Sequence, residues 1–215
     1  MSWNETDWIT FILLLILFLL TILFTLHRRK YTLLLRSLYS SRYFTQLSHE
    51  GKLFQERIFL LDISCILLTQ TLLCYFLIRI FLPNLYATQN SFSLYLISFG
   101  IMVLYNIFNS GMTFIFTYLY DLKEERETYF SYRLFYQTSN NMLLFPLLII
   151  ATYTSFYHLF LVYIPLFLVN FMILTYRLFV LTSKKVHPFH FFIYFCTFEI
   201  LPYLLIAKIL FIIDS

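Results

Sequence analysis

Long runs of apolar side chains, separated by short polar stretches, dominate the hydrophobic pattern of this chain. The runs are about 18 residues or longer, the length an α-helix needs to cross a hydrocarbon core about 30 Å thick. The predicted spans are 8–26, 58–82, 92–119, 136–154, 157–181 and 191–213. We therefore predict an all-α, polytopic protein with six transmembrane helices in a single integral membrane domain over residues 1–215.

The composition supports this class and excludes a separate soluble domain. Hydrophobic residues make up 60% of the chain and charged residues 12%, whereas ordinary globular domains have about 45–50% and about 25%. Three glycines stand against 27 Phe and 18 Tyr, so we expect bulky aromatic packing rather than small-residue helix contacts. The cysteines lie inside apolar runs at spacings that give neither a disulfide framework nor a zinc site.

The charges predict the orientation. The first run begins with acidic MSWNETD and ends in HRRK, which is the pattern of a retained span rather than of a cleaved signal peptide. All basic residues except Arg79 and Lys208 lie in the connections 27–57 and 121–135 or between 177 and 190. Six alternating spans place these regions on one side, and the positive-inside rule makes that side cytoplasmic. We expect a multi-pass inner-membrane protein with both termini extracytoplasmic.

The connection 27–57 interleaves leucines with arginines in LLLRSLYSSRYF. This pattern predicts a short amphipathic helix at the inner interface, between the first two spans, with its basic groups toward anionic headgroups. The basic residues are Arg28, Arg29, Lys30, Arg36 and Arg42. The segment is either a docking surface for a partner or lipid, or a linker that follows the membrane surface.

Glu199 lies well inside the last predicted span, three residues before Pro202. It cannot pair with Lys208, because nine residues correspond to two and a half helical turns and put the two side chains on opposite faces. Lys208 and Arg79 lie near span ends, from which their long stems reach the interface. Glu199 is either protonated or paired with a cation of another helix, such as Arg177 or Arg133.

Polar side chains on five spans share narrow helix faces, and lipid cannot satisfy them. We expect them to face one another in an intramembrane polar network. Its predicted members are Asp62, Asn106, Asn109, Asn140, Asn141, Asn170, Arg177 and Glu199. The network either fixes the register of the helices or lines a polar cavity for a proton, an ion or a headgroup.

Catalytic signatures are missing from the sequence. It has no HExxH, GxSxG or Walker motif, and no nucleophile with an evident base. His187 and His190 form only a weak HxxH pattern, so we expect neither a metal nor a cofactor. Nucleic-acid binding is not indicated either, because topology already explains the basic residues.

The last span carries the most distinctive pattern, FHFFIYFCTFEILPYLLIAKIL. The matching positions are Tyr194, Cys196, Thr197, Glu199, Ile200, Leu201, Pro202 and Lys208. Together with LLLRSLYSSRYF, it resembles an uncharacterised Bacteroidota family of small multi-pass inner-membrane proteins, a domain of unknown function. The resemblance implies a location in the cell envelope and no particular reaction.

Three functions remain open at this point. The first is a non-enzymatic subunit or assembly factor of a cell-envelope complex, with a protein partner or a second copy in the membrane. The alternative is a proton- or ion-coupled transporter or channel that uses Glu199. The third is a membrane enzyme acting on a lipid, quinone or isoprenoid.

Overall fold

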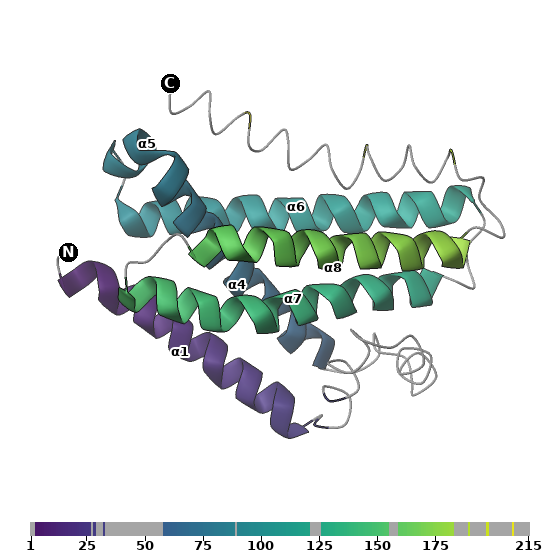
Figure 1. The fold of residues 1–215 in the computed structure, drawn as a ribbon, viewed down its shortest axis with the longest axis horizontal. Coiled ribbons are helices and arrows are strands. Elements are labelled where there is room, and N and C mark those ends of the chain that lie inside the picture. The colour runs from purple at the N-terminus through teal and green to yellow at the C-terminus, as the bar shows by residue number, and fades with distance from the viewer. Residues whose placement is uncertain are drawn as a thin grey trace. The chain divides into compact units, whose positions relative to one another are not determined.

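The computed structural model describes residues 3–26, 28, 32, 58–88, 90–120, 126–154, 159–182, 189, 197 and 208. Over these residues all regular secondary structure is helical and there is no strand, which confirms the all-α prediction for the described part (Figure 1). The helices are α1 (Trp3–Leu26), α4 (Ile58–Phe81), α5 (Pro83–Thr88), α6 (Ser91–Leu119), α7 (Arg126–Thr154) and α8 (Leu159–Thr182).

Three of these helices are long and apolar enough to cross a membrane. The segments are 7–26 in α1, 60–81 in α4 and 91–119 in α6, and they coincide with the first three predicted spans. A shorter apolar stretch, Phe167–Tyr176, lies in α8. The structure thus supports a helical membrane protein, while the count of six spans and the position of the termini stay predictions.

The remaining elements extend the sequence prediction. α7 begins at Arg126, ten residues before the predicted span that starts at 136. Its first turns are polar, so hydropathy alone did not include them. α5 was not predicted; Pro83 occupies its first position, where a fixed φ and a missing N–H are tolerated. The predicted interfacial helix lies outside the described residues, as does the sixth span except for the exposed residues Thr197 and Lys208.

The first of two compact units comprises residues 1–70 and 127–171. It contains α1, the first part of α4, α7 and the first part of α8. α1 buries a stripe at helical spacing, with Ile9, Ile16 and Leu23 at most 1% exposed. The opposite side of α1 exposes Phe11 and Phe18 at more than 60%, as expected for a helix that faces lipid.

The second unit comprises residues 71–126 and 172–215. Tyr75 lies at its centre, fully buried. The ring of Tyr75 makes edge contacts with Phe76, Tyr86 and Tyr95, with centroids 5.6, 6.2 and 6.5 Å apart. Aromatic contacts of this kind join α4, α5 and α6. The expectation of a single membrane domain stays a prediction.

Candidate functional site

The polar side chains of α7 form the candidate site, and the first of their contacts reaches α4. The Oγ1 atom of Thr138 lies 2.8 Å from Oδ2 of Asp62 and 3.0 Å from the carbonyl oxygen of Leu134. Thr138 is 3% exposed, whereas Asp62 is half-buried. Asp62 is the third residue of the candidate span Leu60–Phe81. The pair therefore links two helices at the end of a membrane segment.

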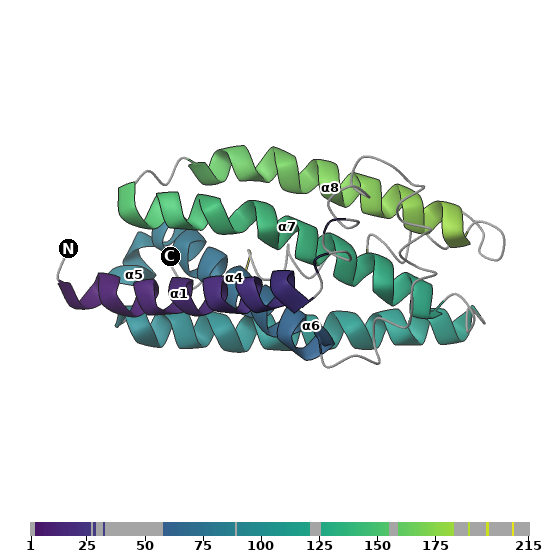
Figure 2. The ribbon, with the colours of Figure 1, turned by 90° about the horizontal axis from the view of Figure 1, so that it is seen from below.

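A second polar contact joins α7 to α8. The Nδ2 atom of Asn170 donates a hydrogen bond to Oδ1 of Asn140 over 2.6 Å. Asn170 is 8% exposed. The two views in Figures 1 and 2 show α7 running beside the part of α8 that belongs to this unit. An amide pair at this spacing holds the register of two helices that otherwise meet through apolar side chains.

A third contact joins α7 to α1. The hydroxyl groups of Thr10 and Tyr153 lie 3.2 Å apart, and either can be the donor. α7 is thus hydrogen-bonded through side chains to each of the other three helices of the first unit. Its apolar positions Leu144, Leu148 and Ala151 are at most 1% exposed, so the same helix also forms much of the apolar core.

Some buried polar groups on α7 have no hydrogen-bond partner within the described residues, and two of them lie close to Asn140 in the sequence. They are the Nδ2 atom of Asn141 and the Oγ atom of Ser139, in residues that are 4% and 1% exposed. A buried N–H without an acceptor is costly. The two residues are two positions apart and point to different sides of α7, so each would separately favour a water molecule or another polar partner.

The residues of the predicted polar network separate into those of the first unit, those outside the described part and, on α6, those of the second unit. Asp62, Asn140 and Asn170 take part in the interhelical contacts of the first unit, and Asn141 is buried on α7. The helix α8 includes position 177, but the side chain of Arg177 lies outside the described part, as does all of Glu199.

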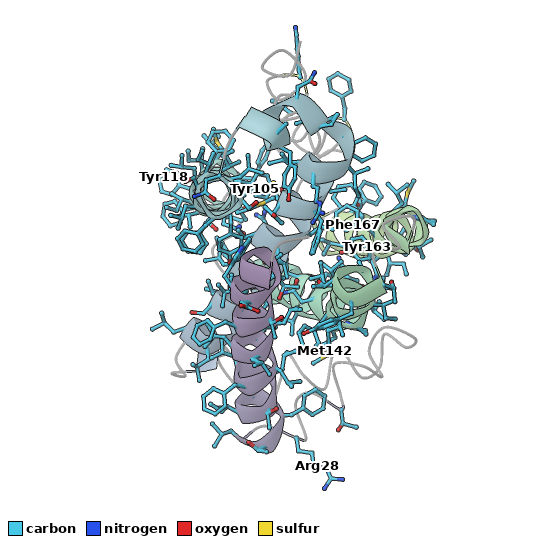
Figure 3. All side chains as sticks on the ribbon, turned by 90° about the vertical axis from the view of Figure 1, so that its left-hand side faces the viewer. Arg28, Tyr105, Tyr118, Met142, Tyr163 and Phe167 are labelled. Atoms are coloured by element: carbon cyan, nitrogen blue, oxygen red, sulfur yellow. The ribbon has the colours of Figure 1, made fainter. Side chains whose placement is uncertain are left out.

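The two asparagines of α6 belong to the second unit and bond within their own helix. Asn106 donates to the carbonyl of Met102 over 2.8 Å, and Asn109 donates to the hydroxyl of Tyr105 over 3.1 Å. In Figure 3, Tyr105 and Tyr118 lie on opposite sides of α6, and they are 7% and 68% exposed. Asn109 is therefore on the inner side of the helix.

Among the basic residues expected at the interface, Arg28 is described. It is exposed and points away from the helices beyond the end of α1 in Figure 3. Arg29, Lys30, Arg36 and Arg42 lie outside the described residues.

Sequence reasoning missed Thr138, the residue that reaches Asp62. A threonine in an apolar helix usually bonds the carbonyl one turn earlier, as Thr113 and Thr152 do here, so it gives little signal by itself. The sequence pointed to Thr138 only through its position, three residues before Asn141 on the same helix face. Arg133, which is 8% exposed on the same helix, was considered only as a partner for Glu199.

The chemistry of this site is that of hydroxyl, amide and carboxyl groups. Within the described residues, no group of three His, Cys, Asp or Glu side chains could hold a metal ion. Asp62 contributes a carboxyl group, and Thr138 contributes a hydroxyl group with two possible acceptors. Asn141 contributes an amide donor without a partner within the described residues.

A family model described as a domain of unknown function (DUF4271) matches residues 9–210. The chain belongs to the DUF4271 family. This confirms the expectation of an uncharacterised family, and the matched range includes the whole α7 site. No curated protein and no solved structure matches this DUF4271 chain significantly. The Bacteroidota origin and the role of the motif in the last span stay predictions.

Proposed function

We propose that this DUF4271 protein is an integral inner-membrane protein that serves as a non-enzymatic subunit or assembly factor of a cell-envelope complex. The proposal rests on the observation that polar side chains of the first unit bond between helices. In the first unit, Asp62, Asn140 and Asn170 take part in side-chain contacts between helices. Such contacts fix helix packing, which is what a structural membrane subunit requires.

The exposed faces of the helices support the same function. α6 exposes large apolar side chains, including Leu104 at 68% and Ile107 at 65%. Gly100 and Gly111 are also exposed on α6, and a Cβ atom built on either would meet nothing within 4 Å. They lie three turns apart on one face. Glycine permits a second helix to approach closely, so this face suits a partner helix.

Native mass spectrometry tests the proposal. The tagged chain, expressed at its natural level in the host, is extracted in a mild detergent. We expect a complex of fixed stoichiometry, with another membrane protein or a second copy of the chain. Gly111→Leu should release the partner without changing the melting temperature of the chain, while Thr21→Leu on the exposed face of α1 should leave the complex intact. A monomer without any stoichiometric partner would contradict the proposal.

Proton- or ion-coupled transport is the second candidate. It is favoured by the carboxyl group of Asp62 at the end of a candidate span and by the unbonded amide of Asn141. Purified protein in sealed lipid vesicles should then carry a flux that Glu199→Gln or Asp62→Asn abolishes. Vesicles whose flux equals that of empty vesicles would exclude this function.

A further inference from the structure

We propose that Asp62 is a proton-binding site, and that the hydroxyl group of Thr138 changes its hydrogen-bond acceptor with the charge state of Asp62. The juxtaposition of Asp62 on α4 with Thr138 on α7 carries this inference. It goes beyond a structural subunit, because it assigns the site a ligand, a proton, and a group that responds to it.

Thr138 has a single hydroxyl hydrogen and two possible acceptors for it. The Oγ1 atom of Thr138 is within bonding distance of two acceptors, Oδ2 of Asp62 at 2.8 Å and the carbonyl oxygen of Leu134 at 3.0 Å. A hydroxyl group has one hydrogen and donates it to one of them. When Asp62 is ionised, Thr138 donates to the carboxylate. When Asp62 is neutral, its own O–H donates to Thr138, and Thr138 donates to Leu134.

Both charge states thus use the same oxygen positions. The proton that binds Asp62 forms the carboxyl O–H, and the hydrogen of Thr138 turns from Asp62 to Leu134. The Oγ1 atom of Thr138 keeps its place, and no covalent bond other than the carboxyl O–H forms or breaks. The site is therefore set up for either state, and the direction of one hydroxyl distinguishes them.

The depth of the two residues also suits proton binding. Asp62 is half-buried and third in its candidate span, so protons from the nearby aqueous phase can reach it. Thr138, which is 3% exposed, contacts the Oδ2 atom of Asp62 from within the unit. A charged carboxylate at the edge of hydrocarbon is costly, and proton uptake removes that cost.

Other groups in the first unit influence the balance. On α4, the nearest ionisable group along the helix is Cys65, three residues after Asp62. On α7, Arg133 and Tyr136 precede Thr138, and Arg28 follows α1. The part of α8 in this unit contains no charged residue. A cation close to the carboxylate would favour its ionised state, whereas apolar surroundings favour the neutral one.

Asn141 gives the site a further donor. It lies one turn beyond Thr138 on the same face of α7, is 4% exposed, and its Nδ2 atom has no partner within the described residues. A water molecule held there would extend the polar path inward from the carboxyl group.

Infrared difference spectroscopy at varied pH tests this inference on the whole protein in lipid vesicles with ¹³C-labelled aspartate. We expect a carboxylic-acid C=O band that grows as the pH falls and is absent in Asp62→Asn. Thr138→Val should raise the proton affinity of Asp62 about tenfold, because the ionised state loses its stronger, charge-assisted bond. Thr138→Ser, which keeps the hydroxyl, should behave as the unmodified protein.

Thr152→Val is the matched control. Thr152 is also buried on α7 and bonds its own helix over 2.7 Å, so its loss should leave the titration unchanged. The inference is overturned if no Asp62 band appears at any pH at which the protein stays folded, or if Thr138→Val and Thr152→Val titrate alike. If Thr138→Val does not fold, the comparison of Thr138→Ser with Thr138→Ala decides in the same way.

Discussion

Polar residues in these apolar helices are satisfied in two ways. Thr21, Thr113 and Thr152 bond the carbonyl four residues earlier in their own helix, which hides the hydroxyl from lipid without joining helices. An asparagine or aspartate has more hydrogen-bonding capacity and reaches a neighbouring helix, as Asn170 does. Residue type alone does not decide between the two ways, since Asn106 and Asn109 bond within α6 whereas Thr138 reaches Asp62 on another helix.

The Asn140–Asn170 pair should contribute measurably to stability. We expect Asn170→Leu to lower the free energy of unfolding by about 1 kcal/mol, since it leaves the Oδ1 atom of Asn140 without this donor. Adding Asn140→Leu should recover part of the loss, so the two effects are not additive. Unfolding in a graded detergent mixture measures each variant. Strict additivity would show that the two amides do not interact.

At the scale of the element, α5 shows how a short helix is held at the end of a span. Six residues are too few for a stable isolated helix. Its Tyr86 packs edge-on against Tyr75 and lies beneath the guanidinium of Arg79, 5.1 Å from the ring centroid. These contacts give Arg79 a partner within the protein, in addition to the interface that its position in the sequence indicates.

Replacement of Tyr86 should loosen α5 locally. In Tyr86→Leu, the cation–π contact and the edge contact with Tyr75 are both lost, which we expect to cost about 1–2 kcal/mol of local stability. Amide hydrogen exchange should accelerate in residues 83–88 and remain unchanged in α7. Tyr86→Phe keeps the ring and should exchange as the unmodified protein does. Equal acceleration in both variants would assign the effect to the hydroxyl group instead.

At the scale of the whole molecule, two patterns define the protein. Three helices are long and apolar enough to cross a membrane, and nearly all basic residues lie in the connections after the first, third and fifth predicted spans. The first pattern indicates that the helices are surrounded by lipid. The second predicts their orientation, because cytoplasmic connections carry an excess of Lys and Arg.

The orientation can be tested with single cysteines. In a variant in which Cys65, Cys74 and Cys196 are replaced by alanine, Arg28→Cys should react with a membrane-impermeant maleimide from the cytoplasmic side. Asn90→Cys, in the exposed connection between α5 and α6, should react from the opposite side. Labelling of both from one side would contradict a membrane crossing by α4, and labelling with the two sides exchanged would reverse the predicted orientation.

The sequence by itself determined the class of the protein. Long apolar runs leave an α-helix as the way to satisfy backbone groups in lipid, so the positions of α1, α4, α6 and α8 follow from hydropathy. The amide residues of α7 were also visible, because Asn140, Asn141 and Asn170 are conspicuous in apolar surroundings. The early start of α7 and the existence of α5 were not, since polar helical turns resemble loops in composition.

Only the tertiary structure decided which polar residues meet. Helical spacing assigns Asp62 and Thr138 to faces of their own helices, but the relative rotation and register of α4 and α7 bring them within 2.8 Å. The same factors separate Asn106 and Asn109, which bond within α6, from the asparagines of α7 and α8. Periodicity along one helix contains no information about the register between two helices; packing of the side chains fixes it.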